Sequence, residues 1–185
     1  GLKENFGTMT KPFHAGQAAR NGTVAALLAS KGFTGARNIL EGKSGFCQVM
    51  SERYDLNKIT ENLGKSWDIL DVIFKPYPCC GSIHPALDAM IFLAREHNIN
   101  PEDVASVEVS TANPLALDEV SRPEPKTVND ARFSTEFCLA IALLDREVSL
   151  KQFAVEKLKD QQILRHARKV RLRVDPGIAK GDPRS

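Results

Sequence analysis

The stretch DARFSTEFCLAIALLD, residues 130–145, decides the fold because few polar side chains interrupt its apolar ones. At helical spacing the apolar residues would lie nearly all round the helix, which is typical of a helix buried on every side. Other elements must surround such a helix in a soluble protein. We therefore expect residues 130–145 to form a deeply buried helix, with Cys138 in the core.

The neighbouring segments predict a mixture of helices and strands. HPALDAMIFLAREHNI, residues 84–99, is an amphipathic helix. VASVEVST (104–111) and KVRLRV (169–174) alternate apolar and polar side chains, which predicts two strands. WDILDVIFKPYP (67–78) is rich in β-branched and aromatic residues and is expected to be extended. The basic residues around the last strand, including His166, are expected at a solvated surface.

The first part of the chain predicts helices alone. HAGQAARNGTVAALLASKGF, residues 14–33, has a broad face of alanines and is stopped by Gly32. Small residues let neighbouring backbones approach closely, so we expect this helix deep in a helical bundle. TGARNILEG (34–42) and LNKITENLG (56–64) are expected to form short helices.

Together these patterns predict an α+β fold. Residues 1–75 would be the later helices of an all-helical domain, residues 76–175 a smaller α+β lid domain, and residues 176–185 a loose tail. One or two strands make an incomplete sheet, because small sheets need further partners for stability. We therefore expect the chain to be truncated at both ends.

Composition excludes several classes of protein. Hydrophobic residues make up 42% and charged residues 26%, the balance of a soluble globular protein. A net charge of +2 gives no support for a nucleic-acid-binding face. No apolar run approaches the ~20 residues that span a membrane, and the start of the chain lacks the layout of a secretion signal.

The four cysteines indicate a reducing compartment and no metal site. Cys47, Cys79, Cys80 and Cys138 show no repeated Cys-x-x-Cys spacing, and adjacent cysteines rarely bridge each other. Free buried cysteines suit the cytoplasm or an organelle matrix. We expect Cys79 and Cys80 to have a structural packing role without a metal, and Cys138 to lie in the core.

The stretch KPYPCCGSIHPALDAM, residues 75–90, contains the first candidate for chemistry, His84. Pro85 suits the first turn of a helix, where no amide hydrogen is required. The positive end of the helix dipole disfavours an imidazolium ion and attracts carboxylates. These features describe a proton-transfer group beside an anion site. The alternative is a structural role, with Ser82 or His84 capping the helix.

The second candidate is the stretch TKPFHAG, residues 10–16. Pro12 is expected to hold Lys11 in an extended conformation, and His14 would open the following helix. A lysine and a histidine three residues apart could bind carboxylates or transfer protons. The alternative is a surface lysine beside a capping histidine.

Taken together, the two stretches resemble the MmgE/PrpD superfamily, which includes 2-methylcitrate dehydratase, cis-aconitate decarboxylase and iminodisuccinate epimerase. The resemblance is carried by GTMTKPFHAGQAARNGTVAALLASKGFTG (7–35) and KPYPCCGSIHPALDA (75–89). RPEPKTVNDARFSTEFCLAIALL, residues 122–144, is similar to the family's segment leading into a buried helix. The similarity extends from about Gly7 to about Val174, in family order.

The resemblance implies a two-domain enzyme without metal or organic cofactor, and usually a homodimer. By motif, Lys11 matches the family's active-site lysine and His84 matches a catalytic histidine on the lid. Thr10 and His14 lie in the same stretch as Lys11, residues 10–16, which we call the lysine block. Both would bind substrate, and we expect the same of Ser82 beside His84. The resemblance also implies that acidic and histidine residues from the N-terminal half of the helical domain take part, and these are expected to lie before Gly1.

The function that the resemblance implies is that of a lyase acting on a small polycarboxylate. A 2-methylcitrate dehydratase, which abstracts a proton and expels water, is the first expectation, and the isolated chain is expected to be inactive. A cis-aconitate-type decarboxylase, an iminodisuccinate-type epimerase or a non-enzymatic interaction module are the alternatives. Decarboxylating members have an aromatic hydroxyl near the position of Glu119, so the acidic residue departs from that pattern. The cytoplasm or the mitochondrial matrix is the expected location, with no nucleic-acid or membrane partner.

Overall fold

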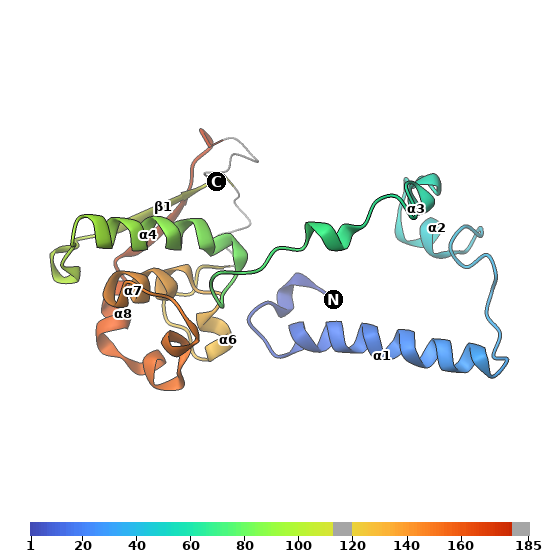
Figure 1. Ribbon diagram of the computed structural model, residues 1–185, viewed down its shortest axis with the longest axis horizontal. Helices are drawn as coiled ribbons and strands as arrows, with labels where there is room; N and C mark the ends of the chain where they lie inside the picture. The colour runs from blue at the N-terminus through green and yellow to red at the C-terminus, as the bar shows by residue number, and fades with distance from the viewer. Residues whose placement is uncertain (113–119, 179–185) are drawn as a thin grey trace. The chain divides into compact units, whose positions relative to one another are not determined.

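The computed structural model describes residues 1–112 and 120–178 (Figure 1), which fall into two compact units. One unit combines residues 1–14 with the described residues from Lys75 onward. The other spans Ala15–Phe74. The mixture of helices with a small sheet agrees with the predicted α+β class. The predicted domain boundaries remain predictions, and most of the predicted tail lies outside the described residues.

The buried helix α7 (Thr135–Asp145) forms the centre of the unit that contains Lys75 and the residues after it. Nine consecutive residues, from Thr135 to Leu143, are buried, as the sequence predicted. Cys138 is fully buried, and Phe137 packs against Phe153 with ring centroids 6.3 Å apart. The apolar surface of α7 therefore sets where the neighbouring elements must lie.

The segment predicted as one helix from residue 130 is two helices in the structure. The short helix α6 (Val128–Ala131) starts at a capping box, in which Thr127 and Asp130 bond to each other's backbone amides. A second cap follows at Ser134, whose side chain accepts a hydrogen bond from the amide of Phe137 at 3.0 Å. Two capping residues seven positions apart start two separate helices, and the chain turns between them.

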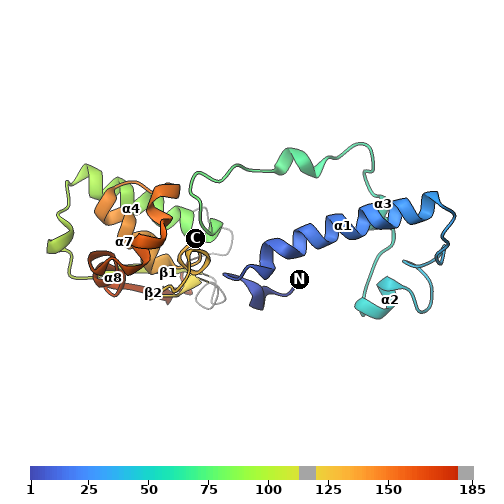
Figure 2. The same ribbon diagram turned by 90° about the horizontal axis from the view of Figure 1, so that it is seen from below.

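Two further helices pack against α7 (Figures 1 and 2). The helix α4 (His84–Glu96) was predicted, and it turns Leu87, Met90 and Ala94 toward the core. The helix α8 (Gln161–Ala167) was not predicted. The remaining turns of this unit are short 3-10 helices: η1 (Lys3–Asn5), η3 (Gly81–Ile83), η4 (Pro101–Asp103), η5 (Leu150–Phe153) and η6 (Val155–Lys159).

Both predicted strands are confirmed, and they pair with each other in parallel. In the described residues β1 (Val107–Thr111) and β2 (Val170–Val174) form a two-stranded sheet, with Val107 opposite Val170. Val170 is buried and the arginines of β2 are exposed, as the alternation predicted. Nε of Arg173 donates a hydrogen bond to the hydroxyl of Ser110 at 3.0 Å and forms an ion pair with Glu108 Oε1 at 2.8 Å, which ties the strands together on the solvent side.

The residues of the second unit are helical or irregular. They include most of the long helix α1 (Thr10–Ser30), together with α2 (Phe46–Met50), α3 (Asn57–Thr60) and η2 (Asp68–Asp71). The long helix stops before Gly32, which has φ +84°, as predicted. No residue of α1 is buried among the described residues, so its place in a helical bundle remains a prediction. No helix in the described ranges is long and apolar enough to cross a membrane.

Two predictions for the second unit are wrong. Residues 34–42 form turns instead of a helix, with the amide of Gly42 bonded to the carbonyl of Asn38 at 2.8 Å. Helices this short are marginal without tertiary packing. Residues 67–78 contain the 3-10 turn η2 where an extended segment was expected. A strand needs a neighbour to satisfy its backbone groups, and none is paired with this segment in the described structure.

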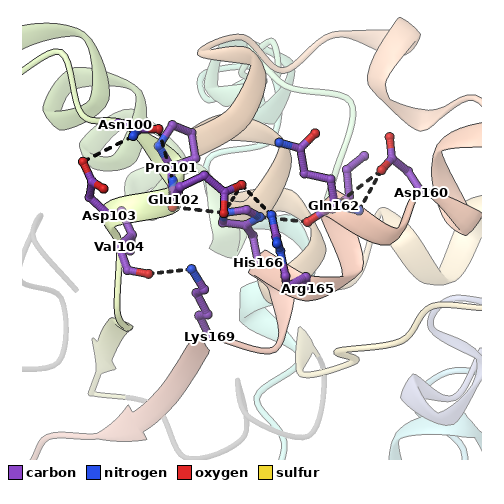
Figure 3. A network of polar contacts seen from close by, with 11 residues as sticks. Asn100, Pro101, Glu102, Asp103, Val104, Asp160, Gln162, Arg165, His166 and Lys169 are labelled. Atoms are coloured by element: carbon purple, nitrogen blue, oxygen red, sulfur yellow. Dashed lines mark hydrogen bonds and ion pairs between the residues drawn. The ribbon is translucent and has the colours of Figure 1, made fainter.

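His166 is buried, which corrects its predicted place at the surface. Its side chain is 1% exposed and lies between two backbone carbonyl oxygens (Figure 3). Nδ1 lies 2.8 Å from the oxygen of Gln162, and Nε2 lies 3.0 Å from that of Pro101. The prediction grouped His166 with the basic residues of the following strand. In the structure His166 belongs to α8 and faces the turn η4. The histidine therefore links α8 to the segment that leads into β1.

We predict that His166→Ala destabilises the chain by about 2–4 kcal/mol, because it removes the buried polar contacts of the imidazole with two backbone carbonyls and leaves a cavity. Urea unfolding followed by circular dichroism measures this. Arg165→Gln is the matched control: Arg165 pairs with Glu102 at the surface, and an exposed ion pair contributes less than about 1 kcal/mol. Equal unfolding midpoints for the two variants would contradict the structural role of His166.

Candidate active site

The lysine block forms the start of the helix α1. Lys11 was expected to be extended, but it is helical. Lys11 is the second residue of the helix, and the hydroxyl of Thr8 accepts a hydrogen bond from the amide of Thr10 at 3.2 Å. Pro12 is tolerated because the first turn of a helix needs no amide hydrogens from its own residues. Thr10 is exposed, whereas His14 lies one turn further on and is half-buried.

The ammonium group of Lys11 lies against two aromatic rings. Its Nζ is 3.9 Å from the ring centroid of Phe6 and 4.5 Å from that of Phe133, and the two centroids are 5.6 Å apart. Such cation–π contacts hold a lysine without neutralising its charge. Among the described residues, no carboxylate lies within ion-pair distance of this ammonium group. The lysine is therefore fixed in place and able to attract an anion.

The stretch around His84, residues 75–90, which we call the histidine block, leads into α4 directly from the turn η3. Ile83 occupies the N-cap position without a side-chain cap, so the predicted capping by Ser82 or His84 is wrong. Ile83 and His84 already have helical dihedral angles, which leaves no extended residue to act as a cap. The imidazole of His84 is therefore free of a capping role.

The ring of His84 is packed, but one of its nitrogens has no partner. It lies edge-on to Tyr77, with centroids 5.3 Å apart and an interplanar angle of 88°. The hydroxyl of Tyr77 donates to Asp88 Oδ1 at 2.5 Å, which holds the tyrosine ring. Within the described residues, Nε2 of His84 is buried without a hydrogen bond. A buried polar atom of this kind is suited to bind a ligand or to exchange a proton with it.

Both blocks contact the turn between α6 and α7. The amide of Cys80, in the histidine block, donates to the carbonyl of Arg132 at 2.8 Å. The next residue, Phe133, provides the ring against which Lys11 lies. Arg132 and Phe133 therefore connect two blocks that are more than sixty residues apart in sequence. We call these two residues the junction.

Two more buried polar atoms lack partners in the described structure, namely Nε of the junction residue Arg132 and Oγ1 of the nearby Thr135. Thr135 is 3% exposed, and the guanidinium carbon of Arg132 lies 6.0 Å from the ring centroid of Phe153. Buried polar groups are usually hydrogen-bonded, so an unpaired group at such a place points to a functional surface. Neither residue was predicted from the sequence as part of the site.

Ser82 lines a different hollow, of about 290 Å³, which lies between α4 and β1. Its lining is mostly apolar and includes Met90, Leu93 and Val107. The hydroxyl of Ser82 lies 3.3 Å from the sulfur of Cys80. Lys11 and His84 do not line this hollow, so the predicted contact between Ser82 and substrate remains a prediction.

All four cysteines are free thiols. Cys79 and Cys138 are buried, as expected for packing residues. A hydrogen bond with Cys138, aided by the nearby ammonium group of Lys75, lowers the pKa of the Cys79 thiol. Burial raises the pKa of the Cys138 thiol well above its usual value. The pair links the histidine block to α7.

The family of the chain follows from two matches. Residues 77–185 match the model of the MmgE/PrpD C-terminal domain, and residues 1–58 match that of the MmgE/PrpD N-terminal domain. The chain belongs to the MmgE/PrpD family. This confirms the resemblance that the lysine and histidine blocks indicated.

Relatives in the family include cis-aconitate decarboxylases of animals and fungi. The chain is 29% identical over 178 residues to the enzyme of Mus musculus and 30% identical over 179 residues to that of Homo sapiens. Each alignment covers 93% of this chain and 36% of the relative. The enzyme of Aspergillus terreus is 26% identical over 185 residues, covering 91% of this chain and 38% of the relative. The chain thus spans little more than a third of the length of these relatives.

Among the residues that sequence reasoning missed, Phe6 and Phe133 hold Lys11, and Tyr77 contacts His84. Tyr77 could have been proposed from the sequence, because it lies in the histidine block. Nothing local in the sequence connects Phe133 with a lysine at position 11. Glu119, at which the sequence was expected to depart from the decarboxylating members, lies outside the described residues.

We predict that Tyr77 titrates far above neutral pH, since burial and its hydrogen bond to Asp88 raise its pKa to about 12 from the ordinary 10.0. The stability contributed by the neutral phenol is complete below pH 10 and is lost as the pH rises toward 12. Phenolate absorbance in a Tyr54→Phe background reports Tyr77 alone, since the chain has two tyrosines.

Asp88→Ala in the same background should lower the pKa of Tyr77, because it removes the carboxylate that accepts a hydrogen bond from the neutral phenol. Asp71→Ala is the control, since Asp71 is an exposed residue of η2. A Tyr77 titration near pH 10 in the parent, or no change with Asp88→Ala, would show that this contact does not form.

Proposed function

We propose that the protein containing this chain is a lyase that acts on a small polycarboxylate. The observation that carries the proposal is the contact of the lysine block and the histidine block with the same junction. Lys11 offers a fixed positive charge, and His84 offers a buried imidazole nitrogen without a partner in the described structure. A cation and a proton-transfer group held by one turn suit a substrate that carries several carboxylates.

We further propose decarboxylation of a cis-aconitate-type substrate as the reaction. The support is the set of relatives named cis-aconitate decarboxylases, which favours this reaction over the dehydration that the sequence first suggested. When the carbon–carbon bond to a carboxylate breaks, carbon dioxide leaves and the electron pair stays on the remaining carbon. Lys11 would stabilise that negative charge, and a proton delivered through His84 would then form the new carbon–hydrogen bond.

Dehydration of 2-methylcitrate is the second candidate, and Glu119 favours it. By the family resemblance, this acidic residue lies near the position at which decarboxylating members have an aromatic hydroxyl. In a dehydration the imidazole would accept the proton from carbon, and water would leave from the neighbouring carbon. Epimerisation would need the same proton abstraction followed by return of a proton to the opposite face. Homodimer formation and a cytoplasmic or mitochondrial-matrix location are further proposals, drawn from the family resemblance and from the free thiols.

We predict that the full-length protein releases carbon dioxide from cis-aconitate faster than it dehydrates 2-methylcitrate. Purified protein is incubated with each substrate, and carbon dioxide and the unsaturated products are quantified. Dehydration of 2-methylcitrate without release of carbon dioxide from cis-aconitate would instead support the dehydratase candidate. Binding of both compounds without turnover of either would favour a non-enzymatic interaction module.

We predict that His84→Ala lowers kcat/KM by about a hundred- to ten-thousandfold, because it removes the proton-transfer group. Lys11→Ala should lower kcat/KM by about a hundred- to thousandfold through the loss of charge stabilisation. His97→Ala and Lys31→Ala are matched controls, because His97 is the exposed C-cap of α4 and Lys31 follows the far end of α1. Wild-type kinetics in both Lys11 and His84 variants would refute the assignment.

We predict that residues 1–185 alone do not turn over either substrate, because the family also uses residues from the first half of the helical domain. Turnover by this chain, measured with both substrates at high enzyme concentration, would refute that prediction. Circular dichroism on the same sample shows whether the chain is folded, so that inactivity can be interpreted.

A further inference from the structure

We propose that Phe6 and Phe133 are positioning residues, which act through Lys11 and hold its ammonium group where the proposed reaction needs it. We call these two rings the aromatic clamp. The inference rests on the proposed function, because it adds two residues to the same site. Three observations carry it: the contact of both rings with the ammonium group, the anchoring of each ring by its own backbone, and the close approach of Gly7 to Asp130.

The two rings contact each other as well as the ammonium group. Nζ of Lys11 lies 3.9 Å from the ring centroid of Phe6 and 4.5 Å from that of Phe133. The ring planes are tilted by 44°, with centroids 5.6 Å apart, a separation typical of aromatic pairs that attract each other. The face of each ring carries partial negative charge and attracts the ammonium group. Two such contacts restrict the end of a side chain that is otherwise flexible.

Each ring of the clamp is anchored by its own backbone. Phe133 lies between α6 and the cap of α7, and its amide donates to the carbonyl of Asp130 at 2.9 Å. Phe6 follows the turn η1. The amide and the hydroxyl of Thr8 both donate to the carbonyl of Asn5, at 3.2 and 2.8 Å, which closes a turn that contains Phe6. Both rings are therefore held by contacts that do not involve the lysine.

Gly7 ties the segment before Lys11 to the start of α6. It is buried and has φ +84°, a conformation that favours glycine. A Cβ atom added to Gly7 would lie 3.3 Å from Oδ1 of Asp130, so close that one of the two residues would have to shift. Asp130 is itself fixed, because it takes part in the capping box of α6. The backbone thus meets the turn that carries Phe133 at a second point, beside the ring contact.

The clamp is expected to matter more for the reaction than for binding. Stabilisation of the charge that develops in a transition state depends on a preorganised position of the stabilising group, and misplacement by about 1 Å can cost a hundredfold in rate. The attraction between an ammonium group and a carboxylate in the ground state falls off more slowly with distance. Weakening the clamp while Lys11 keeps its ammonium group should therefore lower kcat more than it raises KM.

The first test replaces Phe133 in the full-length protein by phenylalanines that carry one, two or three ring fluorines. Fluorine withdraws negative charge from the ring face and changes the shape of the side chain little. We expect kcat for cis-aconitate to fall with each added fluorine, by about two- to thirtyfold in total, which is the range of a cation–π contact. KM should change less than kcat.

The same replacements at Phe137 are the matched control. This ring is buried and packs against Phe153, and the structure places no cation over it in the residues that it describes. A purely structural role of the rings would not follow the number of fluorines. Equal losses of kcat at Phe133 and Phe137, or no trend at Phe133, would overturn the proposal.

A second test observes the contact itself and does not need turnover. Lysine labelled with ¹³C at the ε carbon is incorporated into the full-length protein, and Lys11→Arg assigns the signal. Protons near the face of an aromatic ring resonate upfield, so the ε protons of Lys11 should lie upfield of those of exposed lysines. Phe133→Leu should reduce this shift, whereas Phe133→Tyr keeps a ring face and should retain it.

Phe6→Leu replaces Phe133→Leu if circular dichroism shows that the latter variant does not fold. A Lys11 signal at the position of the exposed lysines in the wild type would overturn the proposal. So would an upfield signal that neither leucine variant changes.

The outcomes separate this inference from the proposed function. Turnover by the wild type without dependence on fluorine at Phe133 would refute the clamp and leave the lyase proposal intact. Absence of turnover, together with an upfield Lys11 signal that moves back in Phe133→Leu, would refute the proposed reaction and support the clamp as the feature that holds Lys11.

Discussion

The burial of α7 from Thr135 to Leu143 is the constraint on which the described site depends. A helix with nine consecutive buried residues cannot leave the amides of its first turn unpaired, because buried backbone groups without partners are costly. Ser134 supplies the cap, and Glu136 binds the backbone of Arg122. The start of the helix is thereby fixed, and with it the turn that precedes it.

The junction, Arg132 and Phe133, in turn fixes the positions of the lysine block and the histidine block. The carbonyl of Arg132 holds the histidine block through Cys80, and Phe133 holds Lys11 through its ring and Arg122 through its carbonyl. Groups from three separate stretches of sequence are thus positioned by two consecutive residues. Such sharing suits an enzyme that must keep a cation and a proton-transfer group in fixed positions about a small substrate, since misplacement by about 1 Å can cost a hundredfold in rate.

The rest of the unit supports α7 from its other sides. The helices α4 and α8 cover it, and His166 connects α8 to the turn before β1. Cys79 and Cys138 link the histidine block to the middle of α7. The second unit has no comparable core in the described residues, and its large apolar side chains such as Trp67, Ile73 and Phe74 are exposed. The stability of the candidate site is therefore expected to depend on the unit that contains α7.

The sequence by itself determined the buried helix, α4, both strands and the family, because these depend on local periodicity and on two short motifs. It could not determine the break at Ser134, the burial of His166 or the helical state of Lys11, since each depends on partners distant in sequence. Phe133 and Arg132 became candidate site residues only in the tertiary structure. The packing of α7 brings them to one turn, and no local pattern encodes a contact between residues 11 and 133.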